Sequence, residues 1–443
     1  MERKRNLYRK AIEDLVTWKN KKNRKPLILR GARQTGKTWL LEHFAQEHYD
    51  SYIRIAFDKS KPAQRIFVPD LEPVRIIREL EDFTGQKVDP ANTLVIFDEI
   101  QDCPLALSSL KYFCEEAPQY QIACAGSFLG IALHEGTSYP VGKIDPLTLF
   151  PLSFTEFLYA LGEEALAKRL KGGNPDMLRL YSEAYTMLLK KYFYVGGMPE
   201  VVAAYTESDS FDEARRIQEG LLGMYDQDFS KHAPLIHVPK IRALWASIPE
   251  QLAKENKKFT YANIAKSARA REYEIAMMWL LDTGIIHKVN RVSAVRHPLR
   301  SYADEKAFKL YGLDVGLLSC MAGLDKNALF GEDESFVEFK GALTEQYVLS
   351  QLIYECGFEP FYWGNDTGSS EVDFLIETGT KAVPIEVKAK IKLKARGLKT
   401  YIEKNRPDIA VRLSLADYKK SEALLDLPLY AVSMLPMLLA EII

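Results

Sequence analysis

The chain has 443 residues, of which 47% are hydrophobic, so it can bury more than one core and its length suits about three domains. Its 59 basic and 60 acidic residues give a net charge of -1, which excludes a global field that attracts nucleic acid or membranes. The five cysteines form no Cys-x-x-Cys pair, and neither a membrane span nor a signal peptide is recognisable. We therefore expect a cytoplasmic protein without disulfides, structural zinc or membrane contact.

The first strong pattern follows a helix expected over residues 7–18. The apolar run Leu27-Ile28-Leu29 predicts a buried strand, and an amphipathic helix is expected from Trp39 onward. Between them lies a Gly-x-x-x-x-Gly-Lys-[Ser/Thr] phosphate-binding loop, whose residues are Gly31, Ala32, Arg33, Gln34, Thr35, Gly36, Lys37 and Thr38, with Trp39 next. Lys37 is expected to reach the β- and γ-phosphates of ATP, and Thr38 to hold Mg²⁺. An ordinary glycine-rich turn ahead of a helix is the alternative.

The next strongly apolar run, over residues 93–99, is expected to be a strand and ends in two carboxylates. The carboxyl end of a buried parallel strand is where an α/β sheet presents its ligands. Asp98 is therefore expected to hold Mg²⁺, and Glu99 to orient and deprotonate the attacking water. The alternative is that both residues cap the following helix. Ser127, after a strand over residues 121–125, is expected beside this site, either to position the water or as a helix N-cap.

The middle of the chain predicts two further regions. Ser153 and Glu156 form a capping box that opens a helical region, which we expect to be a lid over residues 151–235. Three short helices and a hairpin then outline a winged helix over residues 236–322. Its candidate phosphate contacts are Arg269, Arg271, Lys288, Arg291, Arg296 and Arg300. A plain packing module is the alternative to DNA binding.

A second chemical constellation lies in residues 323–443. Glu345 is expected on an amphipathic helix, Asp373 on one strand, and Glu386 and Lys388 on the next strand. Helix-Glu, strand-Asp and strand-Glu-x-Lys follow the order of a PD-(D/E)xK nuclease core. Asp373 and Glu386 are predicted to share a Mg²⁺, while Lys388 assists the attacking hydroxide. A basic stripe beside them, either a nucleic-acid contact or a solvated edge, comprises Lys388, Lys390, Lys392, Lys394 and Arg396.

Together these stretches resemble bacterial and archaeal AAA-type ATPases that end in a restriction-endonuclease-like domain. The resemblance rests on residues 31–38, 98–101, 126–127, 151–154, 196–199, 344–345, 371–374 and 384–388. It implies ATP binding and the order AAA core, lid, winged helix and nuclease-like domain. Relatives tend to carry an arginine where this chain has Lys143, which lacks the planar guanidinium fork. The resemblance therefore implies slow hydrolysis, or a cation supplied from elsewhere.

The predicted fold class is α/β. An AAA-type core with a parallel sheet spans residues 1–150, followed by the lid, the winged helix and the nuclease-like domain. The predicted function is Mg²⁺-dependent ATP hydrolysis that repositions the last two domains on nucleic acid, with DNA favoured over RNA. The alternative is a nucleotide-gated switch for protein partners, in which the nuclease-like fold is an inactive scaffold.

Overall fold

The structure is a computed structural model that describes residues 7–127, 140–254, 257–264, 269–330, 337–365, 370–389 and 396–443. The chain divides into two compact units. The smaller unit holds Arg9–Phe150 with Asp282–Gly284, and the larger unit is built mainly from Pro151–Leu281 and Ile285–Ile443. Each unit is described by itself. Within the described ranges, no helix is long and apolar enough to cross a bilayer.

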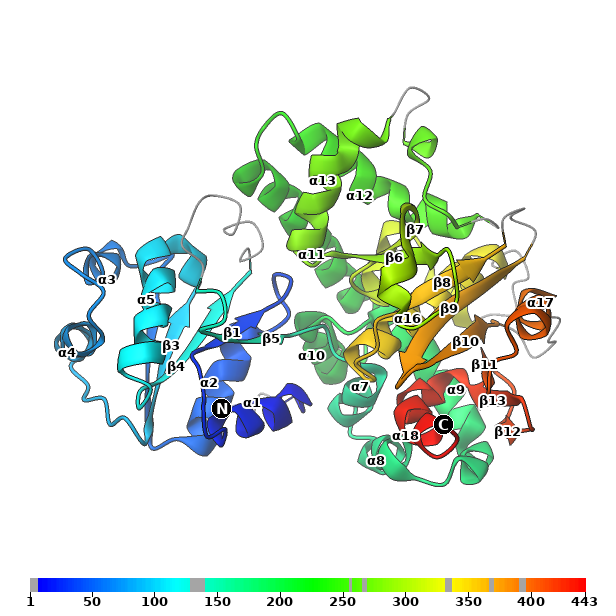
Figure 1. Ribbon diagram of the computed structural model, residues 1–443, viewed down its shortest axis with the longest axis horizontal. Coiled ribbons are helices and arrows are strands. Elements are labelled where there is room, and N and C mark those ends of the chain that lie inside the picture. Colours follow the sequence, from blue (N-terminus) through cyan, green and yellow to red (C-terminus); the bar gives the residue numbers. More distant parts are fainter. Residues whose placement is uncertain are drawn as a thin grey trace. The chain divides into compact units, whose positions relative to one another are not determined.

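A five-stranded parallel sheet forms the centre of the smaller unit (Figure 1). Its strands in chain order are β1 Leu27–Arg30, β2 Ser51–Ala56, β3 Thr93–Asp98, β4 Gln121–Gly126 and β5 Asp145–Thr148. They lie side by side in the order β2-β3-β4-β1-β5. Every residue of β3 is buried, which confirms the prediction from its continuous apolar run, and every residue of β4 is buried as well.

Helices cover both faces of this sheet. They are α1 Ala11–Lys19, α2 Lys37–His48, α3 Lys61–Arg65, α4 Pro73–Thr84, η1 Ile100–Asp102 and α5 Pro104–Glu116. Leu40 and Phe44 of α2 pack with Leu94 and Ile96 on one face. The other face packs a second core that includes Leu80 of α4 and Leu110 of α5. Two cores on one sheet hold the carboxyl ends of β1, β3 and β4 together.

The larger unit contains an eight-stranded mixed sheet in the order β12-β13-β11-β10-β9-β8-β6-β7. Its strands are β6 Ile286–Val292, β7 Ala303–Gly312, β8 Phe361–Gly364, β9 Glu371–Thr378, β10 Lys381–Val387, β11 Ala410–Ser414, β12 Lys419–Lys420 and β13 Leu424–Pro428. The hairpin β6–β7 is the one expected for the wing. It joins the C-terminal strands because β6 pairs in parallel with β8, at Arg291 and Val292.

The remaining helices all follow Phe150 in the chain. They are α7 Phe154–Ala160, α8 Glu164–Gly172, η2 Pro175–Tyr181, α9 Ser182–Val195, α10 Pro199–Ser208, α11 Phe211–His232, α12 Val238–Ala253, η3 Tyr261–Asn263, α13 Ala270–Asp282, η4 Leu299–Tyr302, α14 Val315–Met321, α15 Lys326–Phe330, α16 Val337–Tyr354, α17 Arg396–Asn405, η6 Leu429–Met434 and α18 Leu435–Ala440. The helix expected from Tyr261 is described to residue 264 and begins as the short turn η3. The eight-stranded sheet thus includes strands from both sides of residue 322, where the winged helix was expected to end and the nuclease-like domain to begin. The domain limits and the winged helix stay predictions.

Two sequence motifs of the larger unit, at residues 151–156 and 196–199, are joined by a backbone hydrogen bond. The capping box at Ser153 and Glu156 is present at the start of α7, as predicted. Just before it, the Leu152 N–H donates to the Gly197 carbonyl at 2.7 Å. The Gly197 N–H in turn donates to Asp314 Oδ2 at 2.6 Å. A Cβ on Gly196, where φ is +74°, would lie 2.1 Å from Asp314 Oδ1, so only glycine fits there.

Candidate functional site

The loop between β1 and α2 has the backbone shape of a phosphate cradle. Gly31 has a φ of +154°, and a Cβ there would lie 2.2 Å from the Leu149 carbonyl oxygen. Gln34 and Gly36 adopt left-handed conformations with φ of 65° and 88°, and Gly36 caps α2. The loop therefore curls over the N-terminus of a helix, where backbone N–H groups and the helix dipole favour an anion.

Two buried contacts hold this loop in place. The Thr35 hydroxyl, which is fully buried, donates to the Ala32 carbonyl at 2.9 Å. Arg9 donates from Nη1 to the Thr35 carbonyl at 3.1 Å and from Nη2 to the Phe150 carbonyl at 2.5 Å. Sequence reasoning missed Arg9, because a basic residue just before a helix gives no sign of a buried partner far along the chain.

Lys37 lies inside the cradle. Its Nζ donates to the carbonyls of Gly31 at 3.0 Å and Ala32 at 2.8 Å. Burial lowers the pKa of Lys37 to about 8, against the opposing effect of Glu99 and Asp98. Its ammonium group is thus a poorly solvated cation with weak neutral acceptors, for which a phosphate oxygen is a better partner.

Thr38, Asp98 and Glu99 lie at the carboxyl end of the sheet as predicted. The Thr38 hydroxyl donates to Asp98 Oδ1 at 2.9 Å. Glu99 has a left-handed backbone with φ of 49°, and its Oε2 accepts a hydrogen bond from Gln101 Nε2 at 2.7 Å. A non-glycine residue in this conformation is strained, which is common where a side chain must be aimed at a ligand.

Two other predicted residues have clear places. Ser127 is buried directly after β4, which lies between β3 and β1, so it follows the central strand of the site. Trp39 is 37% exposed, and its ring stacks on His43 with 4.9 Å between ring centroids.

A cation absent from the sequence prediction contacts Asp98. Arg54 of β2 donates from Nε at 3.0 Å and from Nη2 at 2.6 Å to Asp98 Oδ2. Its Nη1 donates to Glu42 Oε1 at 3.0 Å. The sequence showed only an arginine at a polar position of a strand that alternates between apolar and polar residues. Such a side chain ordinarily faces solvent, so the sequence did not predict its contact with Asp98.

Lys143, by contrast, is at the wrong edge of the sheet for a phosphate contact. It precedes β5, whose first residue, Asp145, pairs with Leu27, the first residue of β1. The phosphate loop follows the last residue of β1. Lys143 Nζ is also 2.8 Å from Glu115 Oε1 at the end of α5. Since ligands of such sheets bind at the carboxyl ends of strands, Lys143 does not belong to the nucleotide site.

In the larger unit, the three predicted carboxylates and Lys388 converge. Phe374 pairs with Ile385, so Asp373 and Glu386 come next to each other on the antiparallel strands β9 and β10. Lys388 Nζ is 2.6 Å from Glu386 Oε1, and the Val387 N–H donates to Asp373 Oδ2 at 2.7 Å. The negative charge of Glu345 on α16 also acts on the side chains of Asp373, Glu386 and Lys388 and raises the pKa of each.

Burial and mutual repulsion set the charges of this cluster. Burial, followed by repulsion from Glu345 and Glu386, raises the pKa of Asp373 well above its usual range. Burial also raises the pKa of Glu386, against the attraction of Lys388. For Glu345, burial raises the pKa, but Lys257 and Lys309 outweigh it and hold the pKa below its usual value. Asp373 is therefore the carboxyl group of the cluster whose charged form its surroundings disfavour most.

Sequence reasoning missed two lysines that contribute to this charge balance. Lys257 forms an ion pair with Glu345, which also accepts a hydrogen bond from the Tyr311 hydroxyl at 3.3 Å. Lys309 of β7 is fully buried, and its Nζ is 2.5 Å from Glu371 Oε1. Both lysines come from the segment expected to be a winged helix, which contributes strands to the same sheet.

The carboxylates offer a partial metal site. Glu386 Oε2 is buried and has no hydrogen-bond partner among the described residues. In that part of the chain, no three His, Cys, Asp or Glu side chains are grouped as a metal cage. Mg²⁺ commonly uses one or two carboxylates and fills its remaining positions with water and phosphate oxygens. Asp373 and Glu386 fit such an ion, whose charge would favour the ionised form of both carboxyl groups.

Three of the six candidate phosphate contacts of the winged-helix segment form ion pairs within the protein. Arg291 Nη2 is 2.9 Å from Asp304 Oδ2, Arg300 Nη2 is 2.8 Å from Glu359 Oε1, and Lys288 pairs with Glu305. Three of the lysines expected in the basic stripe, Lys390, Lys392 and Lys394, lie outside the described residues.

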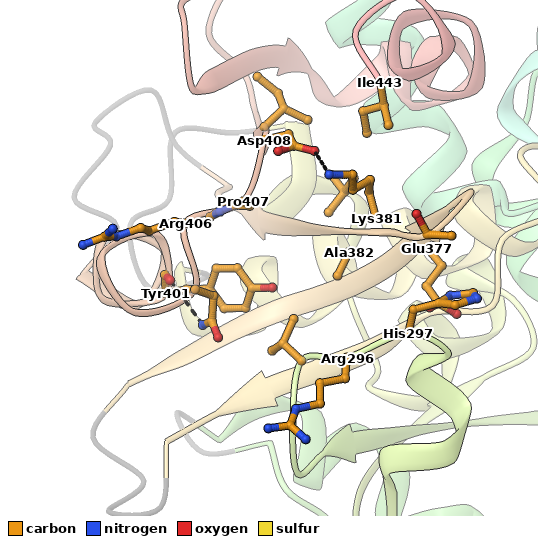
Figure 2. Close-up of a pocket in the computed structure, with 15 residues that line it drawn as sticks. Arg296, His297, Glu377, Lys381, Ala382, Tyr401, Arg406, Pro407, Asp408 and Ile443 are labelled. Atoms are coloured by element: carbon orange, nitrogen blue, oxygen red, sulfur yellow. Dashed lines mark hydrogen bonds and ion pairs between the residues drawn. The ribbon is translucent and has the colours of Figure 1, made fainter.

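A separate hollow of about 180 Å³ lies at the β9–β10 turn (Figure 2). Its charged groups mostly satisfy each other, with Lys381 Nζ 2.8 Å from Asp408 Oδ2 and His297 Nδ1 2.9 Å from Glu377 Oε1. Glu377 is four residues along β9 from Asp373, or about 13 Å. The hollow is therefore distinct from the carboxylate cluster.

The family model of an AAA domain matches residues 23–158. Two further models, both of domains of unknown function, match residues 186–328 (DUF8612) and 340–431 (DUF4143). No curated protein matches the sequence. With the strand order and the loop geometry, the first match shows that the chain contains an AAA-type P-loop ATPase domain.

The comparison with solved structures gives matches of low identity and low TM-score. The Walker-type ATPase PABY2304 of Pyrococcus abyssi is 15% identical, with 72% of this chain and 97% of that chain covered and a TM-score of 0.44. The Aeropyrum pernix ORC1 protein, solved in complex with DNA, is 11% identical, with coverage of 71% and 90% and a TM-score of 0.27. Drosophila ORC, solved bound to DNA, is 14% identical, with coverage of 71% and 95% and a TM-score of 0.26.

Proposed function

We propose that the protein is a Mg²⁺-dependent ATPase in which Lys37, Thr38, Asp98 and Glu99 carry the reaction. The observation that supports this most is the hydrogen bond from Thr38 to Asp98, which joins the phosphate loop to the acidic end of β3. Thr38 and Asp98 would hold Mg²⁺, which supplies charge neutralisation at the phosphates. Lys37 binds the β- and γ-phosphates, and Glu99 takes the proton of the attacking water. Ser127 helps to position that water.

ATP binding by Lys37→Ala tests the nucleotide site. Removing the ammonium leaves the substrate phosphates without their buried cation, so binding should fall at least about a hundredfold. Lys59→Ala is a matched control, since Lys59 follows β2 in the same unit outside the phosphate loop. Equal affinities of the wild type and Lys37→Ala would overturn the assignment.

For the C-terminal site we propose metal-dependent cleavage of nucleic acid, controlled by the nucleotide state of the AAA domain, with DNA favoured over RNA. Support comes from the convergence of Glu345, Asp373, Glu386 and Lys388 and from the unpartnered Glu386 Oε2. Asp373 and Glu386 would hold the metal ion, which polarises the scissile phosphate. Lys388 stabilises the attacking hydroxide, and Glu345 fixes the position of the lysines around the site.

The test is cleavage of mixed single- and double-stranded DNA and RNA with Mg²⁺, with and without ATP. Asp373→Asn should abolish cleavage. Asp408→Asn, which affects an exposed ion pair at the far turn of the same strands, should leave cleavage unchanged. Cleavage that persists in Asp373→Asn would exclude this site as its source.

A second candidate function is a nucleotide-gated switch that binds protein partners, with the C-terminal fold as a scaffold. The pairing of Lys257 with Glu345 and of Lys388 with Glu386 favours it, because these lysines already neutralise the cluster without a metal ion. In this case the wild type should cut no substrate, and ATP turnover should be indifferent to DNA and RNA. Nucleic-acid-stimulated turnover would count against it.

A further inference from the structure

Arg54 contacts Asp98 at the nucleotide site, and the roles proposed above leave this contact unused. Two of its guanidinium nitrogens donate to Asp98 Oδ2, and the third donates to Glu42 on α2. Two N–H groups of the planar guanidinium thus converge on one oxygen of the carboxylate, as charge-assisted hydrogen bonds. The Arg54 side chain is 33% exposed, so it is held by these contacts and is not enclosed by the core.

Its position in the sheet places Arg54 next to the phosphate cradle. Ala56 pairs with Asp98, and Arg54, two residues earlier, lies on the same face of β2. Asp98 accepts from Arg54 on Oδ2 and from Thr38 on Oδ1. A single carboxylate therefore separates the guanidinium group from the first turn of α2, where the phosphates bind.

The site needs such a cation. Three carboxylates, Glu42, Asp98 and Glu99, lie near it, and Lys37 is committed to the centre of the loop. Lys143 lies at the other edge of the sheet with Glu115 as its partner. Mg²⁺ bound to Asp98 and Thr38 would compete with the Arg54 guanidinium for Asp98. For the Arg54 N–H groups released in this way, the phosphate oxygens are the strongest acceptors nearby.

We propose that Arg54 is the residue that distinguishes ATP from ADP. In the nucleotide-free protein it neutralises Asp98, and with ATP bound it exchanges this carboxylate for the γ-phosphate of the substrate. ADP has no γ-phosphate, so Arg54 gains no such partner in the ADP complex. This inference rests on the proposed ATP site and adds to it the device that reads the nucleotide state.

Equilibrium binding of ATP and of ADP, each with Mg²⁺, tests the proposal without relying on turnover. Arg54→Met should weaken ATP binding roughly tenfold to hundredfold, the range for a lost charge-assisted hydrogen bond. ADP binding should change by less than about threefold. Arg54→Lys keeps the charge but lacks the fork, so its preference for ATP should lie between those of the wild type and Arg54→Met.

Arg75→Met is the matched control, because Arg75 pairs with Asp70 on the surface of the same unit. It should retain the wild-type ratio of ATP to ADP affinity. An unchanged ratio in Arg54→Met would overturn the proposal, and if that variant does not fold, an unchanged ratio in Arg54→Lys would do so. A wild type that binds neither nucleotide would instead overturn the proposed ATP site.

Discussion

The buried ammonium of Lys37 makes ATP affinity sensitive to pH. Burial lowers its pKa from the ordinary 10.5 to about 8, so the free protein at neutral pH keeps a cation in a site that disfavours it. The difference corresponds to about 3 kcal/mol. Bound phosphates supply a strong partner for the ammonium, and we expect the pKa of Lys37 to return at least to its usual range when ATP binds.

The direction of the effect follows from proton linkage. Below pH 8 the free protein already carries the proton that ATP binding requires. Above pH 8 that proton must be taken up on binding, so the association constant should fall about tenfold per pH unit up to the pKa of the complex. The stability of the nucleotide-free protein should change with pH in the opposite direction. Between pH 8 and 10.5 the unfolded chain binds a proton at Lys37 that the folded chain has lost, so the free energy of unfolding should rise as pH increases.

The assay is titration of ATP with Mg²⁺ at pH 7, 8 and 9. Affinity should be nearly constant from pH 7 to just below 8 and should be roughly tenfold weaker at pH 9 than at neutral pH. Lys37→Arg, whose guanidinium stays protonated throughout, should show a flat profile at whatever affinity it retains. A wild-type affinity that is unchanged between pH 7 and 9 would refute this account of the Lys37 environment.

Three further predictions concern the framework of the two sites. Gly31→Ala should abolish ATP binding and lower the free energy of unfolding by at least about 2 kcal/mol, because the new Cβ would overlap the Leu149 carbonyl. The control is Gly85→Ala, where the Cβ enters open space. In chemical denaturation this variant should lose about 1 kcal/mol of stability, and its ATP binding should stay intact. Lys309→Met should lower the free energy of unfolding by about 3–5 kcal/mol, since it removes a fully buried cation from the carboxylates. Lys288→Met on the same hairpin should lower it by about 1 kcal/mol or less. Equal losses for the two variants in urea unfolding would argue against a buried charge network. Burial raises the pKa of Asp314 from the ordinary 3.8 to about 6, so the folded state holds its proton more tightly and the free energy of unfolding should fall by about 2 kcal/mol as pH rises from 4 to 7. Asp314→Asn should reduce that slope, and an identical slope in the variant would count against this assignment.

The nucleotide loop could be predicted from sequence because its signal is local. The glycines, Lys37 and Thr38 lie within one short stretch, and the apolar run before Asp98 marks a buried strand by itself. The alternation of β10 likewise predicted that Glu386 and Lys388 share a face, and their side chains are 2.6 Å apart. These inferences need only the periodicity of one element.

The contacts that sequence reasoning missed depend on how distant elements pair. Arg54 reaches Asp98 because β2 lies beside β3, and Lys143 is excluded from the site because β5 runs parallel to β1. Lys309 joins the carboxylates because β6 pairs with β8, across the boundary expected at residue 322. No local pattern encodes such pairings, since strand order is set by the packing of the whole sheet.

The most direct test of the central claim is ATP hydrolysis by the purified full chain with Mg²⁺, compared with Glu99→Gln. The glutamine keeps the shape of Glu99 but cannot accept the proton of water. The account predicts steady turnover by the wild type, and in Glu99→Gln a loss of about a hundredfold or more in kcat with ATP binding retained. Equal turnover by the two proteins would contradict the assignment of Glu99 as the catalytic base.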